Sequence, residues 1–207
     1  MSPAIESKHQ ILSAEDELHW LALRLIPGLG TRRSVQLIER LKTPVAAFRA
    51  SRSELEGLGL AGSVAQSIAS GCTFDEAVLQ QEQLREAGAT LIPYTSPIYP
   101  ENLRTIYDPP LTLFALGRVE LLATAMLAVV GTRRPSAYGK AVAEWLSADL
   151  AQAGLTIISG MARGIDTAAH SATLKAGGNT VAVFGCGVDL VYPAENRKLA
   201  GEIAEKG

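Results

Sequence analysis

Cysteine is scarce in this 207-residue sequence, and long apolar runs are missing. The two cysteines, Cys72 and Cys186, are too far apart for a metal-ligand motif and suggest isolated thiols in a reducing compartment. No apolar stretch reaches the roughly 20 residues that a transmembrane helix needs. Residues 1–20 lack the basic region and apolar run of a signal peptide. We therefore expect a cytoplasmic protein with no metal site and no membrane partner.

A strong net charge is also lacking. The formal charge of −2 gives no global electrostatic case for a nucleic-acid partner. The charges are unevenly distributed, however, because residues 24–52 carry seven lysines and arginines against one glutamate. Residues 53–91 carry six carboxylates against one arginine. This asymmetry indicates an anionic partner for the basic segment.

With 47% hydrophobic and 19% charged residues, the chain can form one sizeable core and a small additional domain. Residues 1–72 predict short helices separated by glycine turns at 27–30 and 57–62, which form two helix–hairpin–helix units. The second of these helices is expected to begin with Thr31 as its N-cap. Residues 73–88 predict a connecting helix closed by Gly88.

Residues 89–207 predict an α/β domain. Apolar strands at 125–131, 155–160 and 179–185 alternate with helices at 136–153, 164–177 and 194–206, after two earlier strands at 89–95 and 111–117. This alternation favours a mostly parallel, doubly wound sheet covered on both faces. In the helix at 136–153, the expected buried face carries Val142, Trp145, Leu146 and Leu150. Since the pattern requires another strand after Gly207, we expect the chain to be part of a longer protein.

Three glycine-containing loops follow the predicted parallel strands, at 131–136, 159–166 and 185–197. Ligands of such sheets bind at the carboxyl ends of the strands, where backbone amides and helix N-termini favour anions. Arg133 and Arg134 have no carboxylate within the next helical turn. Because an arginine fork matches phosphate oxygens, the first loop predicts a phosphate site. A solvated surface pair of arginines is the alternative.

Several ligand and reaction classes are disfavoured. The first loop lacks the G-x-G-x-x-G pattern, the second strand ends in Ser159 rather than an acid, and no Walker A motif is present, so we expect no nucleotide cofactor. Asp166 and His170 could form an acid–base pair on one helix face. A structural role is favoured, because an aspartate in the first helical turn is explained by the helix dipole and no nucleophile accompanies it.

The helical region holds a second candidate site. The "PGLG" turn and the following "TRR" place glycines and two cations at one hairpin, an arrangement suited to the DNA backbone. The alternative is a helical interaction module without DNA. The residues of this secondary site are Gly28, Gly30, Arg32 and Arg33.

The segments "YPENLRTIYDPPLTLFALG", "VVGTRRPSAYG" and "LTIISGMARGIDTAAHSATLKAGGNTVAVFGCGVDLVYPAENRKLAGEIAEKG" resemble the DprA/Smf family of DNA-processing proteins over residues 90–207. Residues 1–72 more loosely resemble the SAM-like or helix–hairpin–helix domain of many members. The resemblance implies an extended Rossmann-like fold, a homodimer and no catalytic activity. It also implies protection of single-stranded DNA in natural transformation and loading of RecA recombinase onto that DNA.

The family motifs assign the site. In the G-[ST]-R motif of the loop after the first of these strands, the arginine of the DNA pocket corresponds to Arg133. The S-G-x-A-x-G-I-D motif falls on 159–166, and Y-P-x-x-N falls on 192–196. Some members have a lysine after Tyr-Pro where this chain has Ala194, and Arg197 or Lys198 could replace it. The predicted DNA-binding residues are Gly131, Thr132, Arg133, Arg134, Ser159, Gly160, Arg163, Gly164, Tyr192, Asn196 and Arg197.

A competing function is a nucleotide-binding Rossmann enzyme of the phosphoribohydrolase, lysine-decarboxylase-like type. Those enzymes also bind phosphate at strand ends. Their P-G-G-x-G-T-x-x-E motif is absent, because "SGMARGID" supplies neither the glycine run nor the acid. DNA binding without catalysis is therefore the favoured prediction, and hydrolysis of a nucleoside monophosphate would distinguish the two.

Overall fold

The computed structural model describes residues 12–207. Residues 1–11 lie outside the described residues. They include the start of the predicted helical domain and most of the segment that was compared with a signal peptide. The chain forms two compact units. One runs up to Gln83 and includes Tyr107–Thr112, and the other comprises Leu84–Ile106 and Leu113–Gly207.

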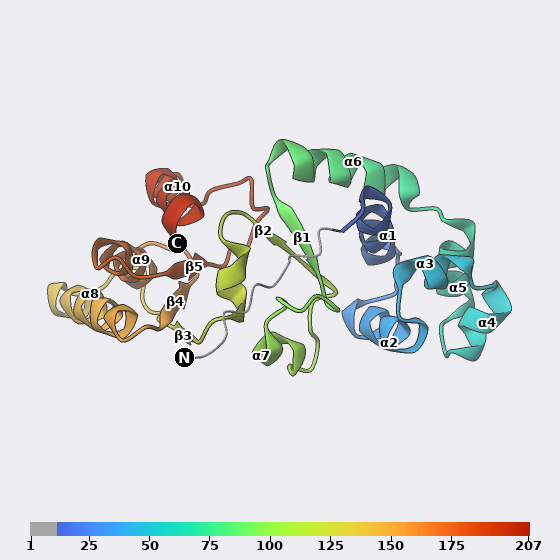
Figure 1. Cartoon of the computed structure of the whole chain (residues 1–207), viewed down its shortest axis with the longest axis horizontal. Coiled ribbons are helices and arrows are strands. Elements are labelled where there is room, and N and C mark those ends of the chain that lie inside the picture. Colours follow the sequence, from blue (N-terminus) through green and yellow to red (C-terminus); the bar gives the residue numbers. More distant parts are fainter. Residues whose placement is uncertain (1–11) are drawn as a thin grey trace, which may run out of the picture. The chain divides into compact units, whose positions relative to one another are not determined.

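The first unit is helical, as the glycine-punctuated sequence predicts. Its core contains Leu21, Leu23, Ile38, Leu55 and Ile68, all less than 2% exposed. The elements, coloured blue to green in Figure 1, are α1 (Ala14–Leu25), α2 (Thr31–Leu41), α3 (Pro44–Arg49), α4 (Arg52–Gly57), α5 (Gly62–Ser70) and the start of α6 (Phe74–Glu86).

Two details of this unit differ from the sequence-based expectation. The N-cap of α2 is Gly30, and Thr31 is the first helical residue, so the expected N-cap position is wrong by one. The positive φ of Gly30, 68°, admits the turn into the helix without a side-chain cap. The short helix α3 was not expected; Pro44 at its first turn and the Thr43 side chain, which accepts from Ala46 N, explain its start.

The second unit shows the predicted alternation of strands and helices. Strands β3, β4 and β5 form a parallel sheet in that order, with Leu127 opposite Ile157 and Ile157 opposite Thr180. Strands β1 and β2 form a separate two-stranded sheet. The elements are β1 (Thr90–Pro93), α7 (Glu101–Arg104), β2 (Thr112–Ala115), a 3₁₀ helix (Val119–Ala123), β3 (Met126–Ala128), α8 (Ala137–Gln152), β4 (Thr156–Ser159), α9 (Ile165–Lys175), β5 (Thr180–Ala182), a 3₁₀ turn (Ala194–Asn196) and α10 (Arg197–Lys206).

Helices α8 and α9 pack against each other and against β4 (Figure 1). Ala151 of α8 and Ala169 of α9 meet Ile157 of β4 in the core of this unit. Helix α10 packs on α9 and β5. The three strands of the predicted alternation thus form one parallel sheet, and the two earlier strands lie in a sheet of their own.

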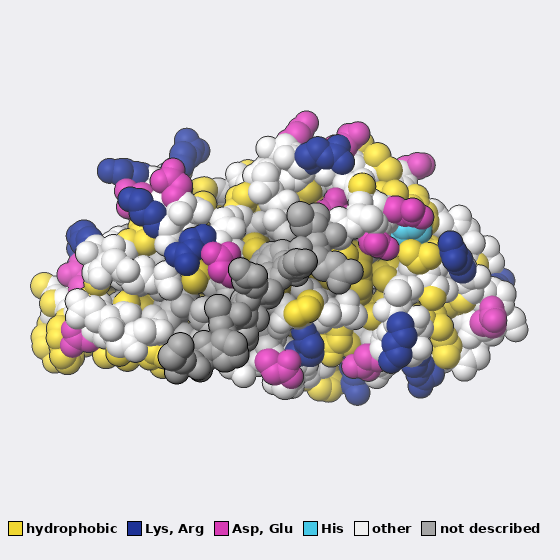
Figure 2. All heavy atoms as spheres, in the orientation of Figure 1, with side chains coloured by type: hydrophobic (Ala, Val, Ile, Leu, Met, Phe, Trp, Pro, Cys, Tyr) yellow, Lys and Arg dark blue, Asp and Glu magenta, His cyan; other side chains and the backbone are white. Residues whose placement is uncertain are grey.

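The buried face of α8 differs in part from the predicted apolar face, of which Leu150 packs against the core. Its buried positions are Ala143, Ser147 and Ala151, whose small side chains allow α9 to approach closely. Trp145 is 64% exposed, and the neighbouring Leu146 is 40% exposed. Figure 2 shows hydrophobic side chains gathered over α8, at the lower left. Small residues therefore form the buried face of this helix, and the larger apolar side chains of Trp145 and Leu146 lie on the surface.

Among the described residues, no helix is both long enough and apolar enough to span a bilayer.

Candidate nucleic-acid interface

Parallel strands bring the predicted loops to one edge of the sheet. The loop at 129–136 follows β3, the loop at 160–164 follows β4, and the loop that begins at 183 follows β5. Because β3, β4 and β5 are adjacent and parallel, their carboxyl ends lie at the same edge. The structure thus brings the predicted DNA-binding residues together on one unit.

The first loop is held to the start of α9 by backbone contacts. Ile165 N donates to the carbonyl oxygen of Thr132 at 3.2 Å, and Arg134 N donates to Thr132 Oγ1 at 3.1 Å. A Cβ at Gly131 would lie 2.7 Å from Ile165 Cγ1. The absence of a side chain at Gly131 lets the loop approach α9, and Thr132 fixes its turn.

The two arginines of this loop point to solvent. Arg133 and Arg134 are exposed, and none of the ion pairs formed within residues 12–207 includes either of them. Their backbone is fixed by the contacts of Thr132, whereas their guanidinium groups remain available. An exposed pair of guanidinium groups on a fixed backbone can bind phosphate through charge-assisted hydrogen bonds.

The loop after β4 is shaped by internal hydrogen bonds. Ser159 is 3% exposed, and its Oγ donates to the carbonyl oxygen of Val129 at 2.6 Å. Asp166 Oδ2 accepts from Ala162 N at 3.2 Å, so this carboxylate closes the loop on itself. Ser159 and Asp166 therefore support the loop from beneath, and the exposed Gly160 and Arg163 form its surface.

Asn196 joins the loop after β5 to the loop after β4. Its side chain is buried, 6% exposed, and Nδ2 donates to the carbonyl oxygen of Met161 at 2.9 Å. The same nitrogen lies 2.9 Å from Thr167 Oγ1. This places a predicted DNA-binding residue inside the protein, as a brace between two loops. Sequence alone gave no signal for this role, because the acceptors are distant in the chain.

Arg163 is already paired in the structure. Its Nε and Nη2 donate to Glu195 Oε1 and Oε2, each at 2.8 Å. Both side chains are more than half exposed, at 59% and 55%. The hydrogen bonds and the negative charge of Glu195 raise the pKa of Arg163 above its ordinary value. The sequence analysis did not single out Glu195. The one feature that could have pointed to it is the presence of an acidic residue within the Y-P-x-x-N motif, at a site that otherwise carries positive charge.

His170 does not reach this surface. It is completely buried, and its Nδ1 lies 2.7 Å from Thr180 Oγ1. That hydroxyl donates to the carbonyl oxygen of Ile157 at 2.8 Å, so the ring nitrogen is the donor to Thr180. Burial lowers the pKa of His170 to about 4, although the charge of Asp166 opposes the shift. These contacts give His170 a structural role and favour that alternative over an acid–base pair with Asp166.

The remaining predicted residues lie on the surface of the same unit. Tyr192 is 74% exposed, and Arg197, the first residue of α10, is also exposed. Lys198 pairs with Glu202 at 3.9 Å. Gly164 is partly buried and is the N-cap of α9.

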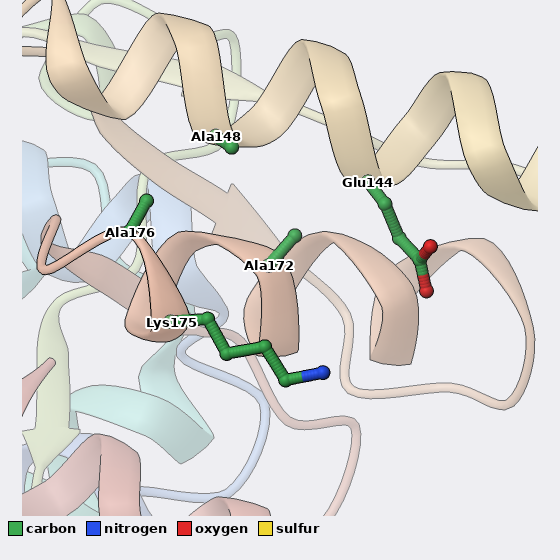
Figure 3. Close-up of a pocket in the computed structure, with 5 residues that line it drawn as sticks. All are labelled: Glu144, Ala148, Ala172, Lys175 and Ala176. Atoms are coloured by element: carbon green, nitrogen blue, oxygen red, sulfur yellow. The ribbon is translucent and has the colours of Figure 1, made fainter.

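A hollow of about 320 Å³ lies elsewhere, between α8 and α9 (Figure 3). Its lining includes Ala148, Ala172 and Ala176, and the side chains of Glu144 and Lys175 border it. None of the predicted DNA-binding residues lines this hollow. The candidate interface is thus an exposed group of loops, and this hollow is separate from it.

In the helical unit, the predicted secondary site is exposed at Gly28, Gly30, Arg32 and Arg33. Arg32 Nη1 donates to the hydroxyl of Tyr107 at 2.6 Å, and its guanidinium lies 4.6 Å from the centre of that ring. Tyr107, which is 79% exposed, was missed by the sequence analysis because it lies far from the hairpin in the chain. Arg33 is in none of the ion pairs of the described chain.

Comparisons with known proteins identify the family of the chain. Residues 90–207 match the family model described as DNA recombination-mediator protein A. DNA processing protein DprA of Bacillus subtilis is 44% identical over 122 residues, which are 58% of this chain and 41% of that protein. Protein Smf of Synechocystis is 32% identical over 203 residues, 95% of this chain and 50% of that protein. The chain spans about half the length of these curated relatives.

The fold is similar to that of a solved relative. The crystal structure of DprA from Streptococcus pneumoniae aligns with a TM-score of 0.69 and 29% identity, over 95% of this chain and 66% of that one. A structure of DNA processing protein A from Helicobacter pylori, described for its single-stranded DNA binding mode, aligns over 52% of this chain and 49% of that one. This alignment has 37% identity and a TM-score of 0.49.

Proposed function

The chain belongs to the DNA recombination-mediator protein A family, the DprA/Smf group of DNA-processing proteins, and from this premise we propose that it binds single-stranded DNA at the loop surface after β3, β4 and β5. The observation that carries the proposal is that the exposed guanidinium groups of Arg133 and Arg134 form no ion pair within residues 12–207 and lie on a loop fixed against α9. The protein holds the DNA backbone and does not cut it.

The chemistry of the surface suits the phosphodiester backbone. An arginine fork can donate two parallel hydrogen bonds to phosphate oxygens. Such contacts make affinity salt-dependent and largely independent of sequence. Exposed Tyr192 adds an aromatic ring on which an unpaired base can stack. Ser159 and Asn196, being buried, contribute by holding the loops in place.

The wider role follows the family resemblance. We propose that the protein acts in the cytoplasm, protects incoming single strands during natural transformation and loads RecA recombinase onto them. In this role it would form a homodimer, with the three described parallel strands belonging to a larger, extended Rossmann-like sheet. The chain spans about half the length of its curated relatives, so dimer formation and RecA loading are tested separately from DNA binding. Sedimentation of the purified chain tests the dimer, and a RecA filament-assembly assay tests the loading.

A weaker backbone contact is proposed in the helical unit. Gly28, Gly30, Arg32 and Arg33 form an exposed hairpin surface within the basic segment. Since Arg32 already contacts Tyr107, Arg33 is the better residue to test. Arg33→Ala is expected to weaken binding less than Arg133→Ala does.

Fluorescence anisotropy with labelled oligothymidine across a salt series tests the main proposal. Arg133→Ala is expected to weaken binding by about tenfold or more and to lower the salt slope by about 0.7 for each lost phosphate contact. Arg85→Ala removes the same charge from α6, outside the predicted DNA-binding loops, and serves as the matched control. Equal losses in the two variants would contradict the assigned site. Hydrolysis of a nucleoside monophosphate would instead support the phosphoribohydrolase alternative.

A further inference from the structure

The three arginines of the interface are in different states. Arg133 and Arg134 are exposed and unpaired among the described residues, whereas Arg163 has its guanidinium fork filled by Glu195. The pair is bidentate, with both N–O distances at 2.8 Å. It also joins two of the three loops, since Arg163 follows β4 and Glu195 lies in the loop after β5.

The carboxylate of Glu195 occupies the position that a phosphate would take. A carboxylate and a phosphate both present two oxygens to the Nε and Nη2 edge of an arginine, in the same parallel arrangement. While Glu195 holds that edge, Arg163 cannot make the same bidentate contact with DNA. The negative charge of Glu195 would also lie beside any phosphate bound there.

We propose that Glu195 is an internal competitor for the DNA backbone: it fills the fork of Arg163 in the free protein and is displaced when a strand binds. This inference rests on the proposed function. According to this inference, Glu195 lowers the affinity for single-stranded DNA and the salt dependence of binding, a role that the surrounding motif does not suggest. Exchange is feasible because both side chains are largely exposed, and exposed ion pairs are weak in water.

The proposal has a measurable consequence. Glu195→Gln removes the competing charge but keeps the side-chain length, so Arg163 becomes free to bind phosphate. Affinity for oligothymidine at low salt should rise by up to about fivefold, the upper range expected for one exposed charge interaction. The salt slope should become steeper, because one more phosphate contact releases counterions.

A double-mutant cycle separates direct competition from general repulsion. The proteins are the wild type, Glu195→Gln, Arg163→Ala and the double variant, compared by anisotropy with oligothymidine. If Glu195 acts through Arg163, the gain from Glu195→Gln disappears in the Arg163→Ala background. Glu144→Gln is the matched control, because it removes an equal charge from an exposed ion pair with Lys140 on α8. Circular dichroism melting checks that each variant is folded.

Two results would overturn the inference. Weaker binding by Glu195→Gln would show that Glu195 positions Arg163 for DNA. An equal gain with and without Arg163 would show that Glu195 acts only as a distant negative charge. Other results would contradict the proposed function. If Arg133→Ala binds oligothymidine as well as the wild type does, the assigned DNA site is wrong. If the wild type does not bind oligothymidine at all, both the proposed function and the competition by Glu195 are wrong.

Discussion

The backbone of Arg133 lies so close to Gly164 that a Cβ at position 164 would be 2.9 Å from both the Cα and the carbonyl carbon of Arg133. Gly164 is the N-cap of α9 and has a φ of 85°, a conformation that residues with a side chain rarely adopt. The position of a candidate DNA-binding arginine therefore depends on an uncharged residue in another loop.

Gly164→Ala is expected to impair DNA binding without removing any charge. The added methyl group must push the loop at 131–134 away from α9 and must also adopt a strained backbone conformation. We expect the free energy of unfolding to fall by about 2–3 kcal/mol and affinity for oligothymidine to fall with it. Urea unfolding and anisotropy at a temperature where the variant is folded measure the two effects.

Gly154→Ala is the control for backbone strain alone. Gly154 has a φ of 90°, but no atom lies within 4 Å of its virtual Cβ. This variant should lose about 1 kcal/mol of stability and bind DNA like the wild type. Normal DNA binding by Gly164→Ala would show that the interface does not need the close approach of the two loops.

Asn196 should matter for stability first and for DNA binding as a consequence. Asn196→Ala leaves the carbonyl oxygen of Met161 without its buried donor, which costs about 1–3 kcal/mol. Asn196→Asp should be more destabilising, because it places a carboxylate oxygen against that carbonyl oxygen. Urea unfolding of both variants, with the exposed Asn102→Ala as control, measures the loss. Unchanged stability combined with weakened DNA binding would instead indicate direct contact of Asn196 with DNA.

The sequence predicted the order of elements well because the relevant signals are local. Apolar runs, helical periodicity and terminal glycines lie within each segment, so the three parallel strands and helices α8, α9 and α10 appear where expected. The family motifs likewise led to loops that the structure brings to one edge of the sheet. Predicted membership of the DprA/Smf family is confirmed by the family match.

The roles of individual side chains were harder to predict, because they depend on partners distant in the chain. Ser159 bonds to the carbonyl oxygen of Val129, just after β3, and Asn196 bonds to the loop after β4. The pairing of Arg163 with Glu195 likewise joins two loops that no periodicity connects. Motifs indicate which loops form the candidate interface, whereas burial separates the residues on its surface from those that support it.

The buried face of α8 predicts that a substitution at Ala151 affects stability more than one at Trp145. The apolar pattern of the sequence predicts the opposite. Ala151→Leu should lower the free energy of unfolding by about 1–3 kcal/mol, because Ala151 is buried beside Gly178 and has no room for a larger side chain. Trp145→Ala should cost less than about 1 kcal/mol, since the indole is 64% exposed. Urea unfolding of both variants is the test. A greater loss of unfolding free energy for Trp145→Ala than for Ala151→Leu would indicate that the apolar face predicted from the sequence is the buried one.

The buried His170 should make the second unit less stable in mild acid. Its pKa is lowered to about 4 by burial, whereas an unfolded histidine has a pKa of about 6.5. Between these values the unfolded chain binds more protons than the folded one, so stability falls as the pH decreases. From pH 7.5 to pH 5 the loss from this group is about 2 kcal/mol.

His170→Gln isolates this contribution. Glutamine retains an N–H donor for Thr180 but does not titrate, so the variant should lose about 2 kcal/mol less than the wild type over the same pH range. Urea unfolding at pH 7.5 and pH 5 provides the comparison, and the carboxylates common to both proteins cancel in the difference. An identical pH dependence in the two proteins would mean that the His170 ring gains its proton without unfolding. The stability of α9, the helix that begins at the candidate DNA-binding loop after β4, would then not depend on a neutral imidazole at its own residue His170.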